Sequence, residues 1–191
     1  MSTVKTTNLQ HPSASDVGIT LGADGSVVLP QGFTGGIGST VVQTVKTDLF
    51  TSTANSYTNI TGLSVTITPS SASSKILLVA QLTVGANAAA QWGHFRFSGG
   101  NSTTYVGAAA GSRTQAVFGG LNNQGDGFYL SAFSMVYVDS PATTSPVTYV
   151  VQGMTGTTNA TTFYINRSQQ DENSNRQARG ASSLLAIEVA A

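Results

Sequence analysis

The sequence contains no cysteine and very little charge. Without cysteine, the chain can form neither a disulfide framework nor a cysteine-based metal site. Only 8% of its 191 residues are charged, and eight basic residues balance eight acidic ones. About a quarter of the residues are charged in an average globular protein. A neutral chain without a clustered basic patch does not favour nucleic acid or a membrane surface as its partner.

Long apolar runs and helix-forming compositions are also missing. No stretch of about 18 apolar residues occurs, so no membrane insertion is expected. The first residues, MSTVKTTNLQHPS, lack the apolar centre of a signal peptide, and we expect synthesis in a cytoplasm. Glu and Lys are scarce, whereas Gly, Ser and Thr are abundant. That composition disfavours long surface helices and favours strands joined by small, uncharged turns.

What is present is organised around the stretch 60–85, ITGLSVTITPSSASSKILLVAQLTVG. Leu63, Val65 and Ile67 alternate with hydroxyl residues, which predicts a strand with one apolar and one polar face. The loop 69–74 holds a proline and small polar residues. The strand 76–84 that follows is apolar on both faces, which is typical of a strand covered on both sides. We expect Ile76, Leu78 and Leu82 to face the core.

Similar patterns recur along the rest of the chain. They predict further strands at 41–47, 92–97, 103–106, 114–118, 128–139, 147–153, 161–166 and 182–189. Short, regularly spaced strands with turn signals between them indicate an all-β antiparallel sandwich or barrel. A jelly-roll-like β-sandwich is favoured because it manages its sheet edges with eight strands in two sheets. An immunoglobulin-like sandwich stays open as the alternative.

The chain divides into three parts by composition. Residues 1–32 form an extended N-terminal segment, in which Asp24-Gly25 between two apolar runs predicts a β-hairpin. Residues 33–40 are glycine-rich and predict a linker. Residues 41–191 form the β-sandwich head domain. Residues 1–17 are either a frayed terminus or an anchor that becomes ordered on a partner.

Strand 128–139 is apolar on both faces, like strand 76–84. We expect its aromatic face to join the second face of strand 76–84 at a subunit interface, because a monomer rarely exposes several hundred Å² of apolar surface. A homotrimer or another oligomer follows from this prediction. The predicted interface residues are Leu77, Val79, Tyr129, Phe133 and Tyr137.

Catalytic patterns are weak. The two histidines, His11 and His94, lie far apart, and no G-x-S-x-G elbow accompanies them. The adjacent carboxylates Asp171 and Glu172 would point to opposite faces of a strand, whereas a glycosidase needs two carboxylates that face each other. No phosphate loop, dinucleotide fingerprint or metal-ligand cluster is present. We therefore expect no enzymatic activity, no cofactor and no metal, and a host-polysaccharide hydrolase is the least favoured hypothesis.

Two loops carry most of the polar side chains. Amide, carboxylate and guanidinium groups on loops of a rigid sandwich suit hydrogen bonding to sugars or to protein surfaces. A plain solvated loop is the alternative. The candidate receptor-contact residues are Asn122, Asn123 and Asp126 in one loop, and Arg167, Gln170, Asp171, Arg176 and Arg179 in the other.

The pattern NLQHPSAS at 8–15, with ITL at 19–21, Asp24-Gly25 and Val27, resembles the N-terminal segments of bacteriophage virion proteins. The similarity is strongest to tail fibres of marine and cyanobacterial phages. SVTITPSSASSKILLVAQLTVG at 64–85 and SSLLAIEVA at 182–190 resemble the jelly-roll head domain common in such fibres.

The resemblance implies a homotrimeric structural protein of the virion, assembled in the host cytoplasm. Its N-terminal segment would attach to tail or capsid proteins, and its β-rich domain would contact a glycan or protein of the host surface. No long repetitive shaft is present, so a capsid decoration, head-fibre or tail connector protein is the alternative. The residues implied in virion attachment are Leu9, His11, Ile19, Leu21 and Val27.

Overall fold

β-Strands make up nearly all of the regular structure in the computed structural model. It describes residues 8–9, 19–21, 27–28, 37–87, 93–120, 127–156 and 161–189, with side chains from residue 40 onward except that of Thr104. The chain forms two compact units, residues 1–36 and 37–191. The unit boundary coincides with the start of the first long strand at Ile37.

The first unit holds a small antiparallel sheet of three short strands, β1 (Asn8–Leu9), β2 (Ile19–Leu21) and β3 (Val27–Val28), in that order. Thr20 pairs with Val28 and Leu21 with Val27. This pairing confirms the hairpin predicted across Asp24-Gly25. The pairing of β1 with β2 has no counterpart in the sequence pattern, because two residues are too few to show a period.

The second unit contains ten strands among its described residues. They are β4 (Ile37–Lys46), β5 (Phe50–Ser52), β6 (Thr58–Ile67), β7 (Lys75–Ala86), β8 (Gly93–Ser98), β9 (Phe118–Gly119), β10 (Ser131–Asp139), β11 (Val147–Thr155), β12 (Phe163–Ile165) and β13 (Ser182–Val189). β4 begins at Ile37 and so takes the last four residues of the segment predicted as a linker.

One predicted strand is wrong, and of the strand predicted at 114–118 only Phe118 lies in a strand, β9. Residues 103–106 were expected to be extended, but a 3-10 turn, η1, spans Ser102–Thr104. The backbone N–H of Ser102 donates to the carbonyl of Gly99 over 3.0 Å, and its hydroxyl donates to the same oxygen over 2.5 Å. These local hydrogen bonds compete with strand pairing, as serine side chains often do in turns.

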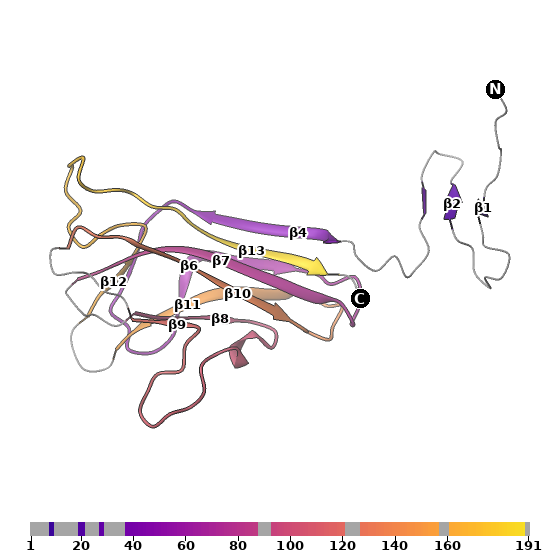
Figure 1. Ribbon diagram of the computed structural model, residues 1–191, viewed down its shortest axis with the longest axis horizontal. Helices are drawn as coiled ribbons and strands as arrows, with labels where there is room; N and C mark the ends of the chain where they lie inside the picture. Colours follow the sequence, from indigo (N-terminus) through magenta and orange to yellow (C-terminus); the bar gives the residue numbers. More distant parts are fainter. Residues whose placement is uncertain are drawn as a thin grey trace. The chain divides into compact units, whose positions relative to one another are not determined.

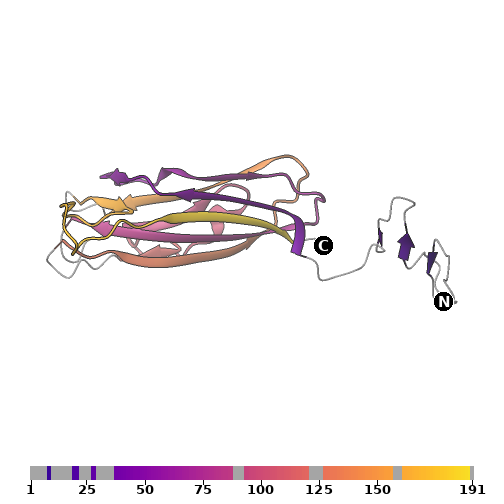
Figure 2. The ribbon, with the colours of Figure 1, turned by 90° about the horizontal axis from the view of Figure 1, so that it is seen from above.

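The strands of the second unit form two antiparallel sheets packed face to face (Figures 1 and 2). In the first sheet, β7 pairs with β13 and β10, and β13 pairs with β4; β12 and β5 extend the sheet at the end of β7. The second sheet has the order β6-β11-β8-β9. Consecutive long strands cross between the sheets, which is the jelly-roll arrangement. The predicted all-β antiparallel sandwich is confirmed.

The core lies between the two sheets and is built by alternation. Ile76, Leu78 and Leu82 of β7 are fully buried, as predicted, and Leu63 and Ile67 of β6 meet them from the opposite sheet. Side chains of the same parity on neighbouring strands therefore share one apolar layer. Burial of this layer supplies the main stabilisation of the sandwich.

The sandwich has two distinct ends. At the proximal end, Ile37 at the start of β4 pairs with Val189 at the end of β13. At the distal end, Lys46 pairs with Ser182, and the loop between β12 and β13 begins. Figure 1 shows this loop at the end of the sandwich opposite to the start of β4. The chain thus enters the sandwich at one end and presents a long polar loop at the other.

Candidate functional site

The polar loop at the distal end, residues 166–180, is closed at its base by Asn166. Its backbone N–H donates to the carbonyl of Thr83 over 2.9 Å, and its own carbonyl accepts from the N–H of Gly180 over 3.0 Å. Asn166 has a φ of 68°, a left-handed conformation that asparagine tolerates better than most residues. We call residues 166–180 the distal loop.

The buried side chain of Asn166 ties the distal loop to the first sheet. Its Nδ2 donates to the carbonyls of Lys46 and Asp48, over 2.8 and 2.9 Å. Its Oδ1 accepts from the hydroxyl of Ser182 over 2.7 Å. The amide therefore uses both of its N–H donors and one of the two lone pairs of its oxygen. The base of the distal loop is therefore fixed on rigid strands.

Ion pairs organise the loop above this base. Asp171 lies 2.7 Å from the guanidinium of Arg179 and 3.6 Å from that of Arg167. The guanidinium of Arg167 also stacks 4.1 Å from the ring centre of Tyr164 on β12. These partly exposed pairs add little stability individually. Together they define where the carboxylate and the two guanidinium groups stand relative to one another.

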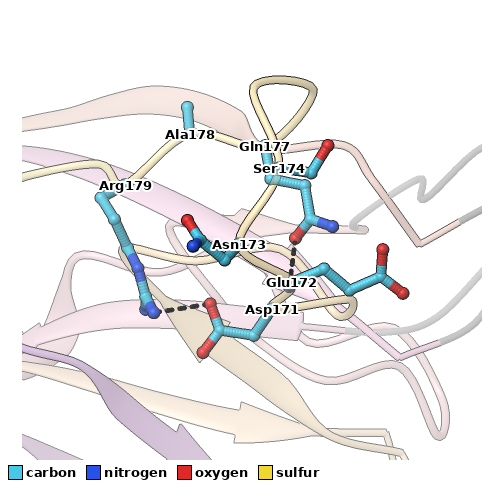
Figure 3. Close-up of a pocket in the computed structure, with 7 residues that line it drawn as sticks. All are labelled: Asp171, Glu172, Asn173, Ser174, Gln177, Ala178 and Arg179. Atoms are coloured by element: carbon cyan, nitrogen blue, oxygen red, sulfur yellow. Dashed lines mark hydrogen bonds and ion pairs between the residues drawn. The ribbon is translucent and has the colours of Figure 1, made fainter.

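A small hollow of about 250 Å³ opens in the distal loop (Figure 3). Seven residues line it: Asp171, Glu172, Asn173, Ser174, Gln177, Ala178 and Arg179. Six of these carry a polar or charged side chain, so the lining offers carboxylate, amide, hydroxyl and guanidinium groups. Such a set donates and accepts hydrogen bonds in several directions over a short distance.

Gln177 supports the wall of the hollow from within. Its Oε1 accepts from the backbone N–H of Glu172 over 3.1 Å, as Figure 3 shows. Its Nε2 is buried without a hydrogen-bond partner among the described residues. The N–H of Gln170 donates to the carbonyl of Gly127 over 3.0 Å, so the segment before β10 contacts the distal loop.

Of the five predicted residues of the second candidate loop, the structure brings Arg167, Asp171 and Arg179 into contact. Arg167, Gln170, Asp171, Arg176 and Arg179 all lie in the distal loop, and Arg176 and Arg179 are exposed. Asn122, Asn123 and Asp126 lie outside the described residues. The hollow is also lined by Glu172, Ser174 and Gln177, which were not singled out for receptor contact although they belong to the same polar stretch, and that polarity was the available signal.

The five predicted interface residues do not share one face. Leu77 and Val79 of β7 point away from the core, whereas Phe133 and Tyr137 of β10 lie on the inner face and pack against the core. Phe133 stacks on Phe118 with ring centres 3.7 Å apart. The register decides this, because Val136 and Val138 pair with Val79 and Leu77 and therefore take the outer face.

Tyr129 precedes β10 near the distal end and is 48% exposed. It lies outside the strand, so the alternation of β10 does not assign it to either face. Of the residues implied in virion attachment, Leu9, Ile19, Leu21 and Val27 lie in the strands of the first unit, and His11 lies outside the described residues.

His94 and Arg96 lie on the outer face of the second sheet. Burial lowers the pKa of His94, which favours the neutral imidazole. Arg96 lies over the ring of Tyr57 at 3.9 Å and donates to Gln152 over 2.9 Å. Among the residues that the structure describes, no group of three histidine or carboxylate side chains is arranged to hold a metal ion.

No protein-family model matches the chain, and no curated protein matches it at a significant level. In the described part of the chain, no helix is long and apolar enough to cross a membrane. The function must therefore be argued from the geometry of the sandwich and its distal loop.

Proposed function

We propose that this protein is a non-enzymatic structural protein of a bacteriophage virion, a trimeric short tail fibre that attaches by its N-terminal segment and presents the distal loop to the host surface. One observation supports the proposal above others: the two ends of the sandwich differ in what they carry. The chain enters at Ile37 beside the end of β13, and the distal loop lies at the opposite end. An attached adhesin needs this separation between its anchored end and its binding end.

The chemistry of the distal loop supports host-surface contact as its role. Three arginines and two carboxylates gather there in a chain that has only eight basic and eight acidic residues in all. Asn166 holds the base of the loop on the strands, so the exposed groups are presented with a defined geometry. Binding residues are often carried in this way, on loops held by a rigid scaffold.

The test is adsorption of the fluorescently labelled protein to host cells. Replacing residues 167–179 by a Gly/Ser segment of equal length is expected to lower cell binding at least tenfold. The matched control replaces the exposed loop 107–113, GAAAGSR, in the same way, and binding should persist. Retained binding after replacement of 167–179 would refute the role of the distal loop.

Two further outcomes decide between the remaining hypotheses. If the unaltered protein binds no host cell but binds purified phage capsids, it is a capsid decoration or head-fibre protein. If it releases reducing sugar from host polysaccharide, the non-enzymatic proposal is wrong. The capsid-binding measurement uses capsids that lack this protein, so that the sites it would occupy on them are free.

A further inference from the structure

The outer face of the first sheet is apolar across four adjacent strands. The strand registers place Val41 of β4, Ile187 of β13, Leu77 of β7 and Val138 of β10 in one row. They place Gln43, Leu185, Val79 and Val136 in the next row toward the distal end. Seven of these eight side chains are aliphatic. We call the two rows together the apolar face.

The side chains of the apolar face are accessible. Val41 is 55% exposed, Val136 is 50% exposed and Val138 is 47% exposed, while Leu77 and Val79 are partly exposed. All point away from the core, because the inward positions of the same strands are the buried ones. The face is therefore not a second side of the core within this unit.

A polar row borders the apolar face on its distal side. In it, Ser183 pairs with Gln81 and Gln81 pairs with Ser134, while Val45 of β4, which also pairs with Ser183, is the one aliphatic member. The hydroxyl of Ser134 donates to Oε1 of Gln81 over 2.5 Å, so these groups are already satisfied. An apolar centre beside a polar rim is the usual anatomy of a protein interface.

The outer face of the second sheet has the opposite character. Thr66 of β6 and Thr148 of β11 share a hydrogen bond of 2.8 Å there, and Gln152 bonds both Asn59 and Arg96. These polar side chains can remain exposed to water without an energetic penalty. Among the described strand residues, the large aliphatic side chains that are exposed, Val41, Val45, Val136 and Val138, all lie on the first sheet.

The apolar face has the size of an interface centre. Four strands about 4.8 Å apart and two rows, each about 7 Å along the strand, cover roughly 270 Å². A standard interface buries about 800 Å² per partner, of which somewhat more than half is apolar. The apolar face supplies more than half of that apolar share, and the polar row begins the rim.

We propose that the apolar face is the surface through which copies of this chain pack on one another. Neither row contains a charged residue, so the face has no charge code with which to select a different protein. A flat, uncharged aliphatic sheet can turn toward the same sheet of the other copies around a three-fold axis without electrostatic conflict. This inference deepens the oligomeric part of the proposed function and is independent of host binding.

The absence of cysteine allows a direct test with the full chain. Val79→Cys at the centre of the apolar face and Val136→Cys on the edge strand β10 would each be the only cysteine. The control is Ser64→Cys, an exposed outward position on the edge strand β6 of the other sheet. Each variant is treated with a short bifunctional maleimide at low protein concentration, and the cross-linked fraction is read on a denaturing gel.

Wild type is expected to show, by light scattering, the mass of an oligomer, which is at least twice the 19.5 kDa of one chain. At least one cysteine of the apolar face should cross-link ten times more completely than Ser64→Cys. A wild type of 19.5 kDa would overturn the proposal. Equal cross-linking at all three positions would also overturn it, because the copies would then associate through another surface, such as the first unit.

A charge variant gives a second, independent reading. Val136→Lys places an ammonium group on the apolar face at a side chain that is half exposed in the isolated unit, so the fold should tolerate it. In the double variant Val79→Cys/Val136→Lys, cross-linking through Cys at position 79 should fall at least fivefold relative to Val79→Cys alone. In the matched double variant Val79→Cys/Ser64→Lys, cross-linking should be unaltered. Unchanged cross-linking in the presence of Val136→Lys would contradict the proposed contact. Neither result depends on whether host cells bind.

Discussion

The phenol of Tyr149 donates a 2.6 Å hydrogen bond to Oδ2 of Asp139, and both side chains are buried. Tyr149 lies on β11 of the second sheet and Asp139 ends β10 of the first, so the bond crosses the sandwich. The same carboxylate accepts from the backbone N–H of Asn101 over 3.2 Å, which fixes the turn before η1. Burial and the nearby carboxylate raise the pKa of Tyr149, so the phenol stays protonated and keeps donating.

Tyr149→Phe should destabilise the protein by about 1.5–3 kcal/mol, because a buried carboxylate loses a hydrogen-bond donor. The measurement is the free energy of unfolding in urea at neutral pH. Tyr105→Phe is the control, because the Tyr105 side chain is 40% exposed and stacks on Tyr137 through its ring, which the change preserves. The control should stay within about 0.5 kcal/mol of wild type. Equal stability of the two variants would contradict the cross-sheet role.

Asn166 predicts a graded response to substitution at the base of the distal loop. Asn166→Ala removes the side-chain bonds to Lys46, Asp48 and Ser182 and should cost about 2–4 kcal/mol. Asn166→Gly loses the same bonds but accepts the positive φ, so it should be about 1 kcal/mol more stable than the alanine variant. Thermal unfolding measures the difference. An alanine variant as stable as the glycine variant would show that the backbone conformation changes instead.

Glu188 predicts a loss of stability in acid. Burial raises the pKa of Glu188, but hydrogen bonds, chiefly those from Ser70, outweigh it and hold the pKa below its ordinary value of 4.5. The N–H and hydroxyl of Ser70 both donate to Oε1, over 2.7 and 2.5 Å. A carboxyl whose pKa is lowered by folding stabilises the protein above its unfolded pKa and loses that contribution as the pH falls through the folded pKa.

The test for Glu188 compares wild type with Glu188→Gln in urea unfolding from pH 7 to pH 3. Wild type should be more stable at pH 7, and the difference should shrink steadily below pH 4.5. Other carboxyl groups titrate in both proteins and cancel in the difference. A gap that stays constant with pH would mean that Glu188 acts through packing and not through its charge.

Substitutions on the inner and outer faces of β10 should differ in their effect on the free energy of unfolding. Phe133→Ala should lower the free energy of unfolding by about 3 kcal/mol, because the ring packs on Phe118 and Phe95 in the interior. Val136→Ala should change it by less than about 1 kcal/mol in conditions where the chain is a monomer, because that side chain is half exposed. Circular dichroism at low protein concentration distinguishes them. Similar losses for both would contradict the assignment of faces.

Much of the sandwich could be predicted from the sequence because alternation is a local property. Leu63, Val65 and Ile67 specify a face without knowledge of any neighbour, and all three are buried in the structure. The prediction that Ile76, Leu78 and Leu82 face the core was correct for the same reason. The polar stretch 167–180 was recognised as a loop by its composition, and the structure places it at the distal end, closed by Asn166, which was predicted to end a strand.

The sequence by itself determined the all-β class, most strand positions and the inward parity of strands with a single apolar face. Only the tertiary structure decided which face of β10 is inner, because both of its faces are apolar and the choice depends on register with β7. It also decided that Tyr149 meets Asp139, that Asn166 closes the distal loop, and that aliphatic rows from four strands align. These relations join residues far apart in the chain, and no local period encodes them.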